Sequence, residues 1–123
     1  MLQRIPRWAE FRAAMWAVRA VVSSRLQLSR IELGLLRLPA PPVVGLAATR
    51  GVEIVIRASA SPCLSASLVR QRWMAAHGLD RDVVIGVASP GGDFRAHAWL
   101  ELPGAITNPD YTAITRIPAR PPA

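Results

Sequence analysis

The chain has 123 residues and a mass of 13.3 kDa, which indicates one domain that is long enough for a modest core. Its net charge is +7, and 51% of its residues are hydrophobic, so we expect some apolar surface to contact another protein or a membrane. A single cysteine excludes an internal disulfide and fits a reducing, cytoplasmic location. No uncharged apolar run approaches the ~18 residues of a membrane-spanning helix, and the recurring arginines argue against a signal peptide.

Residues 1–38 are predicted to form a helical arm that is integral to the domain. Large apolar residues recur there at alternating spacings of three and four, which predicts an amphipathic helix with these residues on one face. This predicted stripe consists of Trp8, Phe11, Met15, Val18 and Val22. Ser29 and Glu32 have the spacing of a capping box, so a second short helix is expected over 30–38.

The predicted stripe is wide enough to pack on the cysteine-bearing part of the domain. Further apolar residues fall outside the stripe and are expected to form a docking surface for a protein partner. They are Trp16, Val21, Leu26 and Leu28. The arm also carries seven arginines against two glutamates, a balance that suits an acidic partner, a membrane surface, nucleic acid or simple solvation.

The only cysteine of the chain stands where a helix is predicted to begin. Ser61 is a favoured N-cap and Pro62 a favoured first helical residue, so Cys63 is expected in the first turn of a helix over 62–77. Gly78 is expected to close this helix. Unpaired N–H groups and the helix dipole favour a thiolate at such a position, which makes the cysteine a nucleophile. The alternative is an inert cysteine buried in the core.

Downstream of the cysteine helix, alternating patterns predict strands. The first covers 82–88 and the second 94–102, where His97 falls on the face opposite the apolar residues. A short third strand is expected over 105–108, and the residues after Tyr111 are expected to form a loose tail. These elements predict an α+β domain in which the cysteine helix packs on a small antiparallel sheet.

Cysteine, histidine and aspartate follow one another in an order that suits a catalytic triad. A thiolate needs a base that also protonates the leaving group, and the base needs a third group that orients its ring. His97 is the candidate base, and Asp110 is the candidate third group, with Asn108 as the alternative. Trp99 is a candidate for lining the substrate groove or for covering the cysteine helix. The histidines and the cysteine lack the spacing of a metal site, and no phosphate-binding loop is recognisable, so we expect neither a metal nor a cofactor.

These motifs resemble the transglutaminase-like cysteine peptidases of lasso-peptide biosynthesis, which remove the leader from a precursor peptide. The resemblance covers residues 43–111 and is carried by Ser-Pro-Cys-Leu at 61–64, Ile-Gly-Val at 85–87 and His-Ala-Trp-Leu-Glu at 97–101. It implies a papain-like or transglutaminase-like fold. Over 43–58, β-branched residues favour a strand, but the resemblance implies a helix that leads up to the cysteine, and we predict the helix.

The resemblance also implies roles for individual residues. Cys63 matches the nucleophile of the family and His97 its general base. The family usually has an acidic residue directly after the asparagine that Asn108 matches, whereas here Pro109 intervenes and Asp110 follows. Both Asp110 and Asn108 therefore stay open as the third member of the triad.

The partners implied by the resemblance are the leader region of a precursor peptide, a separate small leader-recognition protein and a lasso cyclase, with no nucleic acid. Peripheral membrane contact is a further expectation for the arm. The catalytic core is expected over 39–123. Two alternatives remain: an acyl transferase of the transglutaminase type that uses the same triad, and a non-catalytic basic helical binding module in which Cys63 is inert.

Overall fold

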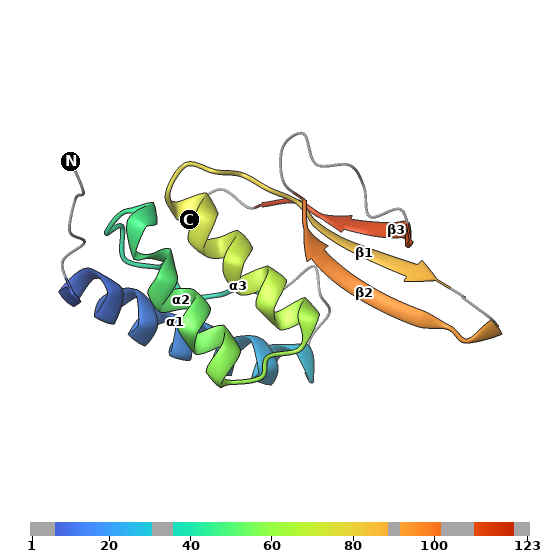
Figure 1. Ribbon diagram of the computed structural model, residues 1–123, viewed down its shortest axis with the longest axis horizontal. Helices are drawn as coiled ribbons and strands as arrows, with labels where there is room; N and C mark the ends of the chain where they lie inside the picture. The colour runs from blue at the N-terminus through green and yellow to red at the C-terminus, as the bar shows by residue number, and fades with distance from the viewer. Residues whose placement is uncertain (1–6, 31–35, 89–91, 102–109, 120–123) are drawn as a thin grey trace.

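Helices precede strands along the chain (Figure 1). The structure is a computed structural model that describes residues 7–30, 36–88, 92–101 and 110–119. Within these residues the predicted α+β fold is confirmed, because three α-helices are followed by a three-stranded antiparallel sheet, and Cys63 begins the third helix. The elements are α1 (Arg7–Leu28), the short 3-10 helix η2 (Leu46–Ala48), α2 (Thr49–Ala58), α3 (Cys63–Ala76), β1 (Val83–Ala88), β2 (Arg95–Leu100) and β3 (Thr112–Ile117).

The cysteine helix α3 lies between the other two α-helices and the sheet (Figure 1). On its helical side, the ring of Trp73 packs against that of Trp16 in α1, with centroids 5.7 Å apart. The Trp73 indole N–H also donates a hydrogen bond to Thr49 Oγ1 of α2 at 2.9 Å. On its sheet side, Leu68 packs against Val83 of β1. Packing on both sides fixes the position of the residue with which α3 begins.

The face of α1 that packs in the core is the opposite of the predicted one. The predicted stripe is exposed, from 45% at Val18 to 66% at Phe11, whereas Trp16 and Val21 are buried instead of forming a docking surface. The periodic pattern predicted the wrong face because α1 has apolar residues on both faces. The face with small side chains is the one that packs in the core, because it allows α2 to approach closely. The buried residues of α1 are Ala9, Ala13, Trp16, Ala17, Ala20, Val21 and Ser24.

At Gly51 the backbone of α2 lies close to the backbone of α1. A Cβ atom at this position would lie 2.3 Å from the backbone oxygen of Glu10, so the two backbones would have to move apart. Alanine is otherwise favoured over glycine in a helix by ~1 kcal/mol. We nevertheless expect Gly51→Ala to lower the free energy of unfolding by roughly 1–3 kcal/mol, the usual cost of overpacking. Urea unfolding measures this, with Ile54→Ala on the exposed side of α2 as a control that changes little. If Gly51→Ala leaves the urea midpoint of unfolding unchanged, the backbones of α1 and α2 do not approach as closely as described.

The second short helix expected over 30–38 is wrong in its described parts, and its middle lies outside the described residues. Arg30 belongs to a turn, and residues 36–40 have no regular secondary structure. Gln27, near the end of α1, holds this segment by two hydrogen bonds. Its Oε1 accepts from the Arg37 backbone N–H at 2.7 Å, and its Nε2 donates to the Arg37 carbonyl. The segment therefore follows the end of α1 without becoming helical.

The helices on either side of the Ser-Pro-Cys motif agree with the sequence prediction. The helix expected within 43–58 is present as α2, after a 3-10 turn. The helix expected over 62–77 is present as α3, with His77 as its C-cap residue. Gly78 follows with a φ of 84°, a left-handed conformation that glycine adopts without a steric penalty. Glycine therefore closes α3 as predicted.

The sheet has β1 at its centre, paired antiparallel with β2 on one side and with β3 on the other. The strands predicted over 82–88 and 94–102 are confirmed as β1 and β2. The expectation of a loose tail is wrong, because β3 forms there, while the strand expected over 105–108 lies outside the described residues. Gln71 of α3 anchors the end of β3, since its Nε2 donates to the Ile117 carbonyl at 2.8 Å.

Candidate active site

Cys63 lies at the exposed N-terminus of α3, where backbone N–H groups have no acceptor within the helix. The first intrahelical bond runs from the Ala66 N–H to the Pro62 carbonyl at 2.9 Å. Pro62 is the N-cap residue rather than the first helical one, and among the described residues no side chain caps the helix. Ser61, the expected N-cap, instead lies with its Oγ 2.6 Å from Ser59 Oγ. The start of α3 therefore offers uncapped N–H groups beside the sulfur, where they can bind an oxyanion.

Strand β2 brings a histidine to this cysteine. Because β2 is an edge strand, the N–H groups along its outer side are not used by the sheet, and that of Ala98 donates to Cys63 Sγ at 3.4 Å. The residue before Ala98 is His97, and His97 and Cys63 line the same pocket, whose volume is about 380 Å³. The structure thus places the predicted nucleophile and the predicted base along one pocket, and their catalytic roles stay a prediction.

The pocket runs along one side of α3. Its α3 wall is formed by residues spaced three or four apart, which lie on one face of the helix. Its β2 wall includes Trp99, so the candidate substrate-binding residue lies in the same pocket as the nucleophile. The lining residues are Cys63, Ser67, Arg70, Met74, His97, Ala98, Trp99 and Leu100.

The imidazole of His97 is packed among aromatic rings. It stacks on Trp99 with centroids 5.8 Å apart, and the ring of Tyr111 lies 5.4 Å away. Trp99 lies over Gly86 of β1, because a Cβ at Gly86 would be 2.7 Å from the Trp99 ring. This explains the glycine in the Ile-Gly-Val motif, since a larger residue would displace the indole next to the histidine. Tyr111 was not singled out from the sequence, because an isolated aromatic residue carries no chemical signature.

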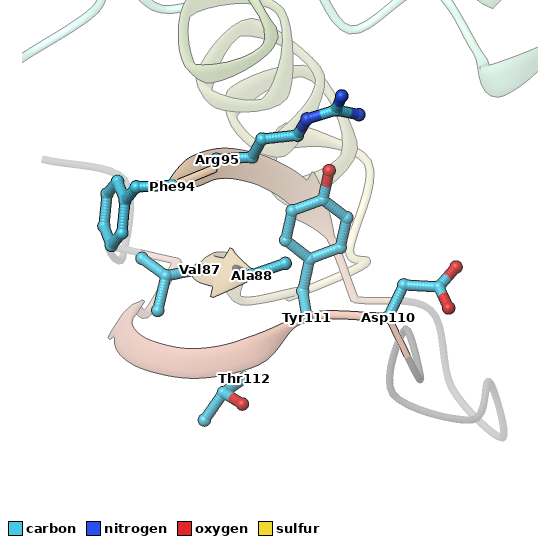
Figure 2. Close-up of a pocket in the computed structure, with 7 residues that line it drawn as sticks. All are labelled: Val87, Ala88, Phe94, Arg95, Asp110, Tyr111 and Thr112. Carbon is cyan, nitrogen blue, oxygen red and sulfur yellow. The ribbon is translucent and has the colours of Figure 1, made fainter. Parts of the chain in front are cut away.

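Asp110 lines a different hollow from that of Cys63, at the far end of the sheet (Figure 2). This hollow measures about 620 Å³ and is also lined by Tyr111, the residue that contacts His97. Asp110 is exposed, and Figure 2 shows its carboxylate directed away from the rest of the hollow. Asn108 lies outside the described residues. The third member of the triad stays a prediction.

Arg70 stands in the wall of the Cys63 pocket and is held there by a carboxylate. Its Nε and Nη2 donate to the two carboxylate oxygens of Glu53 in α2, each at 2.8 Å. The hydrogen bonds from Arg70 lower the pKa of Glu53 below its ordinary value, against the opposing effect of partial burial. The bidentate pair fixes the guanidinium plane and ties α2 to the pocket.

The Glu53–Arg70 pair predicts a pH-dependent stability. Because the pKa of Glu53 is lowered in the folded state, its contribution is present above its ordinary pKa of 4.5 and is lost as the pH falls through the lower folded value. Both side chains are about one-third exposed, so Glu53→Gln should cost less than ~1 kcal/mol at neutral pH. Thermal unfolding of both proteins across the acid range should show curves that converge at low pH. A gap that persists under acid conditions would contradict this ion pair.

Two kinds of feature are absent from the part of the chain that the structure describes. There, no group of three or more His, Cys, Asp or Glu side chains is placed to hold a metal ion. In the same residues, no helix is long and apolar enough to cross a membrane.

Comparison with known proteins agrees with this architecture. A family model described as the transglutaminase-like superfamily matches residues 11–117, which include most of α1, the cysteine helix and the sheet. The match crosses the boundary expected after residue 38, and that boundary stays a prediction. Searches of curated proteins and of solved structures returned no match. The chain, with its cysteine at a helix start beside a histidine-bearing strand, belongs to the transglutaminase-like superfamily.

Proposed function

We propose that this protein is a cysteine peptidase that cleaves the leader from a lasso-peptide precursor. One observation carries the proposal: Cys63, beside the uncapped N–H groups of α3, shares a pocket with His97 of the edge strand β2. This pairing supplies a nucleophile, a base and oxyanion donors in one place. The resemblance to leader peptidases supplies the substrate class.

The proposed reaction starts with the Cys63 thiolate attacking the carbonyl carbon of the last leader residue. His97 holds the proton of the thiol, and the new oxyanion is stabilised by the N–H groups at the start of α3. The C–N bond then breaks, and His97 gives its proton to the departing amine of the core peptide. Water, deprotonated by His97, hydrolyses the thioester, so the leader leaves with a new carboxylate and the thiolate is restored.

The shape of the pocket supports a peptide substrate. The pocket extends from Cys63 along α3 toward Met74, and Trp99 and Leu100 form the opposite wall. Apolar walls with a fixed guanidinium suit a peptide segment that places side chains on the walls and carbonyl groups near Arg70. We assign Trp99 to substrate binding on this basis, and Asp110 or Asn108 to orienting the imidazole.

The resemblance also supplies the proposed partners. A separate leader-recognition protein delivers the precursor, and a lasso cyclase acts on the released core peptide. A small domain with an open pocket gains affinity when a second protein holds the leader, because cleavage then becomes effectively intramolecular.

A second candidate function follows from the superfamily itself. A thioester on Cys63 can be attacked by an amine instead of water, which makes the same site an acyl transferase. The two activities differ only in the acceptor, so they share the first half of the mechanism. The products distinguish them, because a peptidase yields a leader with a free carboxylate and a transferase yields an amide.

The proposal is tested with the genes that neighbour this one. They should encode a short precursor peptide, a small recognition protein and an asparagine-synthetase-like cyclase. The purified chain, mixed with that precursor and recognition protein, should then produce two fragments that mass spectrometry identifies as leader and core. An intact precursor after long incubation with folded protein, or a neighbourhood without a precursor gene, would argue against a leader peptidase.

A further inference from the structure

The outer face of α1 carries a continuous line of large exposed apolar side chains. We call it the α1 ridge. Its residues are between 45% and 66% exposed and follow the period of the helix from the first turn to the last. At ~1.5 Å per residue, the ridge is roughly 27 Å long. The residues of the ridge are Trp8, Phe11, Met15, Val18, Val22 and Leu26.

Arginines border the ridge on both sides. At ~100° per residue, Arg7 and Arg25 lie along one border, and Arg12 and Arg19 lie along the other. All four are exposed, and the Arg12 guanidinium lies 6.0 Å from the centroid of the Trp8 ring. Within α1, the acidic residue is Glu10, which is half-buried on the side toward α2. The exposed half of α1 is therefore apolar at its centre and cationic at its borders.

We propose that the α1 ridge binds the surface of a membrane that contains anionic phospholipids. An apolar stripe with aromatic residues, bordered by cationic side chains, is the composition of helices that lie in the interface of a bilayer. The apolar side chains enter the boundary of the acyl chains, and the arginines remain at the level of the headgroups. Each arginine near an anionic surface adds electrostatic attraction.

Other occupants fit the ridge less well. A second copy of the chain would bring the arginine borders of two ridges together without a carboxylate from either ridge to neutralise them. A protein partner needs hydrogen bonds as well as apolar contact, at about one per 100–200 Å² of interface. Between its borders the ridge offers no polar side chain, whereas the acyl region of a bilayer requires none. The positive charge of the borders and the lack of polar side chains between them therefore favour an anionic lipid surface over a second copy or a protein partner.

Membrane binding leaves the candidate active site accessible. The ridge faces away from the core, because the buried face of α1 packs on α2 and α3. The Cys63 pocket is lined by residues of α3 and β2, and β2 lies on the side of α3 away from α1 and α2 (Figure 1). The proposal is therefore independent of the peptidase activity, and either can fail without the other.

The test uses the full chain and sedimented vesicles. Vesicles of phosphatidylcholine alone are compared with vesicles in which half of the lipid is phosphatidylglycerol, at low and high salt. Phe11→Ser combined with Val22→Ser removes two ridge side chains. The matched control combines Phe94→Ser with Val43→Ser, which changes the same two residue types at positions at least as exposed but outside α1. Circular dichroism checks that each variant is folded.

We expect the unaltered chain to bind the anionic vesicles, and binding to weaken as salt rises. The ridge variant should bind at least tenfold more weakly, while the matched control binds like the unaltered chain. Arg12→Gln combined with Arg19→Gln should reduce the preference for anionic over neutral vesicles. Three results would overturn the proposal: no binding of the unaltered chain, equal binding of the ridge and control variants, or a ridge-dependent dimer or protein complex formed by a chain that ignores vesicles.

Discussion

Cys63→Ala is expected to abolish cleavage of the precursor and to leave the fold intact. The substitution removes the sulfur that forms the thioester, so the rate should fall by roughly 10⁶-fold, the scale seen when the nucleophile is removed from a catalytic triad. Cys63 is exposed, and its loss leaves no cavity in the core, so thermal unfolding should change little. The measurement is the initial rate of leader release, followed by mass spectrometry under identical conditions for both proteins.

Thr112, which lines the same hollow as Asp110, provides a matched control for this substitution. Thr112→Ala removes one polar group from an exposed side chain that does not line the Cys63 pocket. Its cleavage rate should equal that of the unaltered chain. If Cys63→Ala cleaves at a rate comparable to this control, Cys63 is not the nucleophile, and the non-catalytic binding module becomes the better description.

His97→Gln is expected to have the second-largest effect on the rate of precursor cleavage. The amide is similar in size to the imidazole but cannot accept the thiol proton or return it to the leaving amine, so cleavage should fall by ~10³-fold or more. Alkylation of Cys63 by iodoacetamide near neutral pH should also slow, because an imidazolium beside the sulfur favours the thiolate. Alkylation requires no substrate, so it reports on the site even when the precursor is absent.

The other histidine provides the control. His77 is the C-cap residue of α3, its ring packs on Trp73 with centroids 4.4 Å apart, and its Nε2 accepts from the Gly45 N–H at 3.2 Å. His77→Gln should therefore lower the free energy of unfolding by about 1 kcal/mol while leaving the alkylation rate of Cys63 unchanged. Equal alkylation rates in His97→Gln and the unaltered chain would remove His97 from the site.

The parts of the site that depend on local patterns could be predicted from the sequence. A proline directly before Cys63 and a glycine at 78 delimit the helix by their own backbone preferences. The alternation around His97 places that residue and Trp99 on one face of β2, as their stacked rings confirm. These signals lie within a few residues of the features that they predict.

The face of α1 could not be predicted by the same means. Hydrophobic periodicity locates an apolar face, but α1 has two, and the choice between them depends on which partner helix must fit against it. Glycine at 51 and the alanines of α1 allow the close approach, and this fit becomes visible only when both helices are in place. The residues of the α1 ridge consequently stay exposed.

The surroundings of Asp110 and the presence of strand β3 could also not be predicted from local sequence patterns. Asp110 was chosen because it follows His97 in an order that suits a triad, and it stays a prediction because order along the chain does not fix distance in space. In the fold, Tyr111, the residue after Asp110, contacts the His97 ring, and Tyr111 and Asp110 line the same hollow. The strand β3 that follows was missed because its pairing with β1 depends on contacts distant in sequence.

A leader peptidase of this kind requires that water hydrolyses a thioester between Cys63 and the leader. The most direct measurement is mass spectrometry of the precursor after incubation with the chain and the recognition protein in water enriched in heavy oxygen, with a primary amine added as a competing acceptor. We expect a leader fragment with heavy oxygen in its new carboxylate, a core peptide with a free amine, and neither fragment with Cys63→Ala. A leader that carries the amine as an amide would contradict the peptidase assignment and establish the transferase, and heavy oxygen incorporated equally by Cys63→Ala would contradict the thioester.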